Sequence, residues 1–131
     1  MINSLKLTKY VLEILKLDEN LVKYIPYKSI YPIDARLSSK FPFAVIQRTS
    51  VIPANAKDGT YEDTVYFSLM IVDDNYIGSV NIAEAIRTAL DRRAYKTDEI
   101  NIRSIRLVGA SETLYDESFI QQLDFIATIQ N

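Results

Sequence analysis

The segment Tyr61–Asp73 constrains the fold more tightly than any other part of the chain. Its positions alternate between an apolar set and a more polar set. The apolar set is Val65, Phe67, Leu69 and Ile71, and the other set is Glu62, Thr64, Tyr66 and Ser68. Successive side chains of a β-strand point to opposite faces of the sheet. The pattern therefore predicts a half-buried antiparallel strand, and with it a sheet whose one face is covered.

Four other segments predict further strands of this sheet. They are Lys28–Tyr31, Phe43–Ser50, Ile100–Gly109 and Phe119–Gln130. The second has apolar residues on both faces near its start, which indicates a central position in the sheet. In the third, the alternation slips between Ile102 and Ile105, which indicates either a β-bulge or a strand with apolar residues on both faces.

Amphipathic periodicity predicts two main helices. The first runs to about Leu17, with Asn3 or Ser4 as the capping residue. The second runs from Val80 to about Arg92 and is capped by Ser79. Between the first helix and the first strand, Asp18 is expected to cap a short turn of helix.

The remaining segments are predicted to be loops, namely Ile33–Lys40, Ile52–Thr60, Asp74–Gly78 and Ala110–Ser118. The element order is then α-β-β-β-α-β-β. It predicts an α+β fold with a mostly antiparallel sheet of about five strands and two main helices packed on one face. A chain of 131 residues is expected to form one domain, spanning 1–131.

Composition narrows the classes of function. The chain has no Cys and no His, so thiol nucleophiles, disulfides and catalytic triads with histidine are excluded. Lys and Arg number 15 against 17 for Asp and Glu, which lacks the basic surplus typical of nucleic-acid binders. The apolar run Leu5–Leu17 contains several charged residues, so no membrane span or signal segment is predicted, and we expect a cytoplasmic protein.

Carboxylate pairs are the remaining candidates for chemistry. Asp73 and Asp74 adjoin at a strand end and are interpreted as a turn, with cation binding as the alternative. Asp116 and Glu117 lie in a loop and are interpreted as a solvated turn. Glu62 and Asp63 could act as a catalytic carboxylate pair only if another chain or strand faced them. No phosphate-binding glycine pattern occurs. We therefore predict no enzyme activity and no catalytic, cofactor or metal site.

Two groups of residues are candidates for binding a partner. Tyr61, Glu62, Thr64 and Tyr66 give one long strand a polar and aromatic surface, which favours a subunit contact; the alternative is an aromatic rim under the helices. Arg48, Arg103 and Arg106 could line a positive surface that contacts an acidic partner or passing DNA. The alternative for these arginines is a solvated sheet rim.

The chain resembles the small phage and prophage tail-completion proteins, also called tail terminators or tail-to-head joining proteins. The resemblance runs nearly end to end. It rests on Leu12-x-x-Leu15, Asp18-Glu19-Asn20-Leu21-Val22, Ser29-Ile30-Tyr31-Pro32, Phe41-Pro42-Phe43-Ala44-Val45-Ile46, the strand Thr64–Val72, Ala83-Glu84-Ala85-Ile86-Arg87-x-x-Leu90, and Leu123-Asp124-Phe125-Ile126-Ala127.

This resemblance implies a structural assembly protein in the virion tail. Such a protein forms a ring, often a hexamer, on the end of the tail tube. Its partners would be further copies of itself, the tail tube protein and a head-completion protein, with DNA only passing through the lumen. The resemblance implies no cofactor and no membrane partner. Two other classes stay open from the sequence: a small ligand-binding or regulatory α+β domain, and an enzyme that uses carboxylates.

Overall fold

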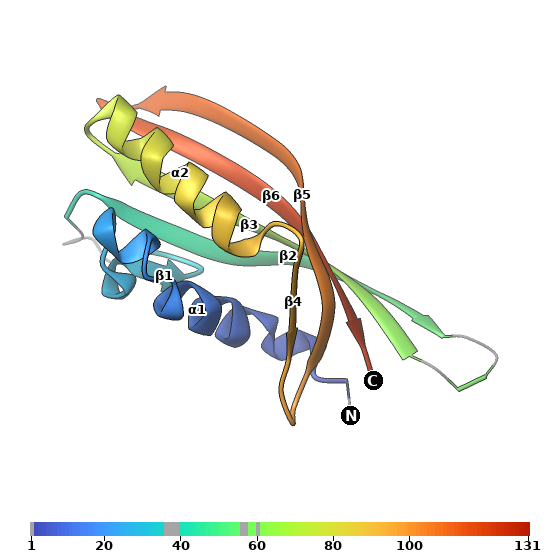
Figure 1. Ribbon diagram of the computed structural model, residues 1–131. Helices are drawn as coiled ribbons and strands as arrows, with labels where there is room; N and C mark the ends of the chain where they lie inside the picture. Colours follow the sequence, from blue (N-terminus) through green and yellow to red (C-terminus); the bar gives the residue numbers. More distant parts are fainter. Residues whose placement is uncertain (1, 36–39, 56–57, 60) are drawn as a thin grey trace.

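The computed structural model describes residues 2–35, 40–55, 58–59 and 61–131. Within these residues two α-helices lie against a curled six-stranded sheet (Figure 1). In chain order the elements are η1 (Ser4–Lys6), α1 (Leu7–Leu17), η2 (Leu21–Lys23), η3 (Tyr27–Ser29), β1 (Ile30–Pro32), β2 (Phe43–Asn55), β3 (Tyr61–Asp73), α2 (Tyr76–Leu90), β4 (Arg93–Lys96), β5 (Asn101–Tyr115) and β6 (Ser118–Gln130).

The sheet has the strand order β1-β2-β3-β6-β5-β4. β1 pairs with β2 in parallel, and the other neighbours are antiparallel. The α+β architecture is confirmed, but the prediction of five strands is corrected to six strands in a mixed sheet. The added strand, β4, is short and mostly exposed, so it lacks the apolar alternation that reveals a strand in sequence.

Two strands are longer than predicted. β2 continues through Asn55, and β5 continues through Tyr115, so the predicted loops Ile52–Thr60 and Ala110–Ser118 are wrong over most of their described length. Both extensions are exposed segments whose extended form comes from pairing with β3 and β6. Residues 56–57 and 60, and residues 36–39 of the loop predicted after β1, lie outside the described residues.

The predicted bulge in β5 is confirmed. The pairing of β5 with β6 shifts between Ile102 and Ser104. The extra residue allows Ile102 and Ile105 to be buried together although they are three positions apart. A second shift follows between Leu107 and Gly109.

The helices begin differently from the prediction. Asn3 does not cap with its side chain; it has φ 62° and its Nδ2 donates to the Glu99 carbonyl at 2.6 Å. The second helix begins at Tyr76, capped by Asn75, whose Oδ1 accepts from the Gly78 N–H at 2.8 Å. The predicted turn Asp74–Gly78 is therefore partly helical.

One predicted cap is confirmed and the other is not. Asp18 Oδ1 accepts from the Leu21 N–H at 2.7 Å and caps η2. Ser79 was expected to cap α2 but lies inside it, fully buried, where its Oγ donates to the Tyr76 carbonyl at 2.6 Å. An asparagine one residue before the helix is a favoured cap, so the helix starts as early as Asn75 allows.

The core lies between the helices and one face of the sheet. α2 packs on β3 and β6, and α1 lies beside α2 and against β2. Val65, Phe67, Leu69 and Ile71 are all buried there, as predicted. Phe67 stacks on Phe125 of the neighbouring strand, with ring centroids 5.2 Å apart. The helices thus cover one face and leave the other available.

Candidate functional site

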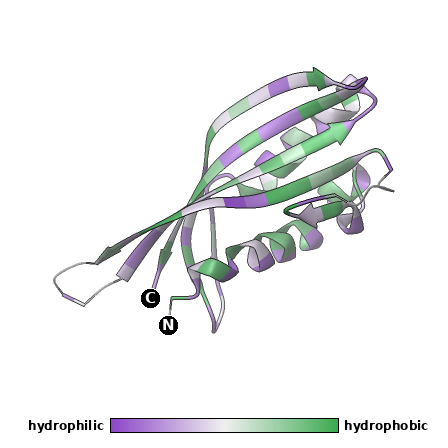
Figure 2. Ribbon diagram, turned by 180° about the vertical axis from the view of Figure 1, so that it is seen from behind, coloured by the Kyte–Doolittle hydropathy of each residue, from purple (hydrophilic) through white to green (hydrophobic). Residues whose placement is uncertain are grey.

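The second face of the sheet lies away from the helices, and in Figure 2 its strands stand in front of α2. We call it the open face. Pairing between β3 and β6 brings two rows of residues onto its central part. On β3 these are Glu62, Thr64, Tyr66, Ser68, Met70 and Val72; their partners on β6 are Gln130, Thr128, Ile126, Asp124, Gln122 and Ile120. Most of these side chains are half-buried, so the face is neither a core nor a fully solvated surface.

Three of the four residues predicted to form a subunit contact lie together on this face. Glu62, Thr64 and Tyr66 follow one another at alternate positions of β3. Glu62 is anchored, because its Oε2 accepts from the Gln130 Nε2 at 2.7 Å. Further along the same strand, the Ser68 hydroxyl donates to Asp124 Oδ1 at 2.7 Å. The polar side chains of Glu62 and Ser68 on this face are therefore held in place by hydrogen bonds.

Tyr61 lies apart from the other three. It begins β3 and is 50% exposed. Its N–H donates to Asn131 Oδ1 at 3.1 Å, and its carbonyl accepts from the Asn131 N–H at 3.2 Å. The alternation of the strand directs it to the face opposite Tyr66. Tyr61 and Tyr66 therefore do not share one surface.

The three arginines do not form one surface either. Arg48 is opposite Phe67 in the sheet, on the helix side, and its Nη1 donates to the Leu5 carbonyl at 2.5 Å. Arg106 is opposite Ile126, on the open face. Arg103 is the extra residue of the β5 bulge, and both it and Arg106 are exposed. Arg48 ties the start of the first helix to β2, whereas Arg103 and Arg106 lie on β5.

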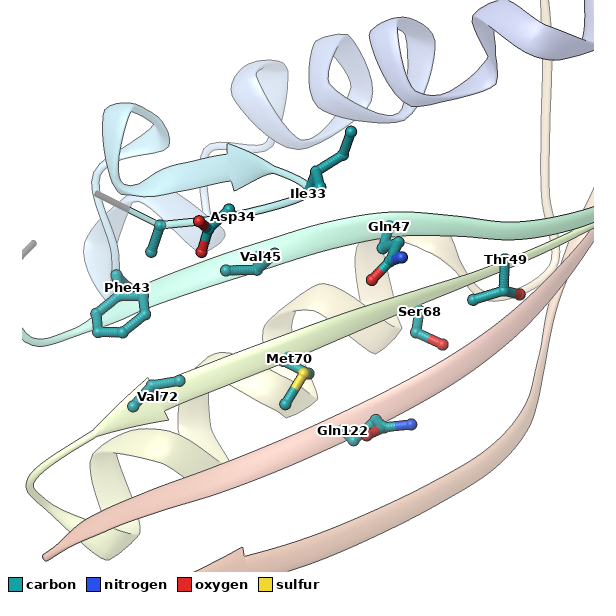
Figure 3. A pocket seen from close by; sticks show the side chains of 11 residues that line it. Ile33, Asp34, Phe43, Val45, Gln47, Thr49, Ser68, Met70, Val72 and Gln122 are labelled. Atoms are coloured by element: carbon teal, nitrogen blue, oxygen red, sulfur yellow. The ribbon is translucent and has the colours of Figure 1, made fainter. Parts of the chain in front are cut away.

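A hollow of about 520 Å³ opens on the same face, beside the segment that follows β1. Its floor is apolar, and Figure 3 shows Val45 of β2 with Met70 and Val72 of β3 directed into it. Its other lining residues are Ile33, Asp34, Ala35, Phe43, Gln47, Thr49, Ser68 and Gln122. The hollow lies outside the sheet–helix core, so it is not a cavity between the sheet and the helices.

Sequence reasoning did not find this hollow. A signal was present, because β2 begins with apolar residues on both faces and β3 ends with apolar Met70 and Val72 on its otherwise polar side. Only the pairing of Val45 with Met70, and of Phe43 with Val72, joins these residues into one patch. That pairing needs the sheet register, which periodicity alone does not supply.

The two members of the acidic pair at the end of β3 differ in burial. Asp73 is 7% exposed and Asp74 is exposed. Burial, followed by a hydrogen bond with Asp74, raises the pKa of Asp73 above its ordinary value of 3.8. Close by, α2 and β5 are joined by the Tyr76 hydroxyl, which donates to Glu112 at 2.9 Å. This hydrogen bond raises the pKa of Tyr76 above its ordinary value of 10.0.

The second acidic pair forms a turn. Asp116 and Glu117 join β5 to β6, are exposed and have φ values of 49° and 62°. Two residues with positive φ are typical of a tight hairpin turn, so the interpretation as a solvated turn is confirmed. Across residues 2–35, 40–55, 58–59 and 61–131, no three acidic side chains converge as a metal site would need. No helix in those ranges is long and apolar enough to cross a bilayer.

The comparison with known families shows to which family the chain belongs. Residues 9–129 match the family described as "Tail completion protein gp17". The chain belongs to this tail completion family. It is therefore a structural protein of phage tails and of virion assembly, and the family is not one of enzymes. The resemblance inferred from the sequence motifs is thereby confirmed.

A solved structure shares the fold of this chain. A chain from the "Virion of native gene transfer agent (GTA) particle" superposes on this tail completion protein with a TM-score of 0.80. The match covers 92% of both chains at 14% sequence identity. At that identity the likeness shows a shared fold. No curated protein sequence matches the chain.

Proposed function

We propose that this tail completion protein forms a ring that caps the end of the tail tube and joins it to the head. The observation that carries the proposal is the family match over residues 9–129. The shared fold with a chain of a phage-like virion supports it. The working stoichiometry is a hexamer of identical copies, with the tail tube protein on one side and a head-completion protein on the other.

Self-association is proposed to use the open face. Glu62, Thr64 and Tyr66 present ordered polar atoms next to an aromatic ring, a combination enriched at protein interfaces. Tyr61 is proposed as a separate contact at the start of β3, where half of its surface is exposed. Each copy would assemble in the cytoplasm and end in the virion tail.

Arg103 and Arg106 are proposed to face the lumen or an acidic partner. Both are exposed and neither forms an ion pair within the described ranges. The net charge of the chain is −2, so a ring of copies would attract DNA only locally. A weakly charged lumen suits a channel that DNA must pass and not adhere to. Arg48 is left out of this group because it binds the Leu5 carbonyl.

The test is the mass of the particle in solution. Size-exclusion chromatography with light scattering is run over a range of concentrations, alone and with tail tube protein. We expect a discrete multiple of the 15.0 kDa chain. A variant carrying Glu62→Lys and Tyr66→Ala should remain monomeric. Tyr24→Ala, which removes an exposed tyrosine remote from the open face, should assemble normally. A strict monomer that also fails to bind tail tube protein would contradict the proposal.

A further inference from the structure

The outer half of β5 is an uncovered sheet edge. β4 pairs with β5 no further than Ile105, and Figure 1 shows no strand beside the rest of it. The N–H of Leu107 is bound by Asp91 Oδ1 at 2.9 Å. Past the second bulge, alternation directs the peptide groups of Ala110, Glu112 and Leu114 away from β6. None of these three groups has a partner among the residues that the structure describes.

Past its second bulge, this edge lacks the devices that protect the opposite one. On β2, past its pairing with β1, Arg48, a bulge and Pro53 follow one another. A proline and an irregular edge both hinder the addition of a foreign strand. On β5 the uncovered part begins with Arg106 and a bulge, but residues 109–115 beyond the bulge carry one charge, Glu112, and no proline. An unprotected edge is expected to be covered in the assembled state.

The edge ends in an exposed apolar tip. Leu114 is 62% exposed and Tyr115 is 72% exposed. The tight turn of Asp116 and Glu117 follows at once and holds the two side chains at the end of the hairpin. Tyr115 has the same parity on β5 as Thr113, which is opposite Ile120 on the open face. The ring of Tyr115 is therefore presented on the side of the sheet that carries the hollow.

The hollow lies at the same end of the sheet and near the other edge. A single row of paired residues, Phe43, Val72, Ile120 and Thr113, crosses the sheet from the hollow to a point two residues short of Tyr115. Two copies standing side by side would thus bring the tip of one next to the hollow of the other. A contact between two different surfaces of identical chains generates a closed ring when the rotation closes.

We propose that the hollow on the open face receives the ring of Tyr115 of the neighbouring copy. The proposal rests on the ring of the proposed function and names one of its contacts. The apolar floor of Val45, Met70 and Val72 suits an aromatic ring, and the carboxylate of Asp34 on the wall is an acceptor for a tyrosine hydroxyl.

Charge supports a second copy as the occupant. Asp116 and Glu117 are the only charged residues of the hairpin turn. Lys40 is exposed three positions before Phe43 of the hollow, and has no ion-pair partner in the part of the chain described here. The acidic turn of one copy would face this lysine on the next. Opposite charges across a contact fix its register more than its strength.

Cysteine cross-linking tests the contact directly, because the natural chain contains no Cys. Tyr115→Cys protein is mixed with Gln47→Cys protein under mild oxidation, with or without tail tube protein. We expect disulfide-linked dimers in the mixture and far fewer with either variant alone. Tyr27→Cys, an exposed tyrosine beside α1, serves as the matched control for Tyr115→Cys and should not cross-link to Gln47→Cys. Ser111→Cys reports the rival arrangement, in which two β5 edges pair with each other about Ser111.

The outcomes separate this contact from the proposed function. Loss of the ring in Tyr115→Ser, with a normal unfolding transition and with mixed cross-links in the cysteine pair, supports both proposals. If the wild type and Tyr115→Ser both form the ring, and the cysteine pair gives no mixed cross-links, the proposed contact is overturned. The ring of the proposed function is then unaffected. Ser111→Cys homodimers without mixed cross-links also overturn it. A wild-type chain that forms no ring even with tail tube protein overturns both.

Discussion

The two faces of β3 share one backbone and differ in almost everything else. On the helix side, Val65, Phe67 and Leu69 are at most 1% exposed. On the open side, Tyr66 and Ser68 are half-buried, and Met70 is 38% exposed. The helix side is completed by the chain's own α2. The open side has ordered hydrogen bonds and an apolar hollow, yet nothing in the described chain covers it. The first face accounts for the fold, and the second is where a structural tail protein can meet its neighbours.

The largest expected effect comes from Phe67→Ala. Phe67 is 1% exposed and stacks on Phe125, so its removal leaves a cavity between two strands and α2. We expect the free energy of unfolding to fall by about 3–5 kcal/mol, measured by urea unfolding. Natural domains are stable by only about 5–15 kcal/mol, so a large part of the margin would be lost.

Tyr66→Ala is the matched change on the open side. It removes a similar ring from the adjacent position of the same strand, and we expect a loss of about 1 kcal/mol. The measurement should be made at a concentration where the chain is monomeric. Equal losses for Phe67→Ala and Tyr66→Ala would break the comparison, because the open face would then be as tightly packed as the core.

A comparable effect is expected from Ser68→Ala. The Ser68 hydroxyl donates to Asp124 Oδ1 at 2.7 Å, and Gln122 Nε2 donates to the same oxygen at 3.1 Å. Loss of the shorter bond to a partly buried carboxylate should cost about 1–2 kcal/mol in chemical denaturation. Ser50→Ala, at an exposed position on the neighbouring strand, should change stability by less than about 0.5 kcal/mol. If the two variants are indistinguishable, the open face is not ordered by its own hydrogen bonds.

The contrast between the faces also explains what the sequence could predict. Tyr61–Asp73 is predicted to the residue because its apolar alternation records the burial of one face. β4 and the outer half of β5 show no such alternation in the sequence, because their side chains are mostly exposed. Their extended form depends on pairing with a neighbouring strand. Glu62, Thr64 and Tyr66 were recognisable as one surface because they share a strand.

The hollow was beyond sequence reasoning for a related reason. Val45 and Met70 are far apart in the chain and meet only through the register of β2 with β3. The arginines failed as a group for the same cause, because a bulge and a separate strand set their faces. Patterns within one strand can be read from sequence, whereas contacts between strands require the pairing.

Asp73 is the exception on the helix side of β3, and it provides the smallest test of the comparison. It is a carboxylate at the buried parity of the strand, 7% exposed, and burial raises its pKa above 3.8. A folded-state pKa above the unfolded value means that the charged form is disfavoured by folding. Its contribution to stability is fully present below about pH 3.8 and is lost as pH rises through the folded-state pKa.

Asp73→Asn should therefore stabilise the fold modestly at pH 7 and have little effect at pH 3. The amide removes the buried charge and keeps an oxygen that can accept from the Asn75 N–H, as Asp73 Oδ1 does at 3.4 Å. The melting temperature of the variant and the wild type should be compared across this pH range. Asp98→Asn, at an exposed turn position, is the control and should show no such pH-dependent gain. A variant that is less stable than wild type at pH 7 would mean that the Asp73 charge is satisfied by its hydrogen bonds, and that the helix side of β3 tolerates polarity after all.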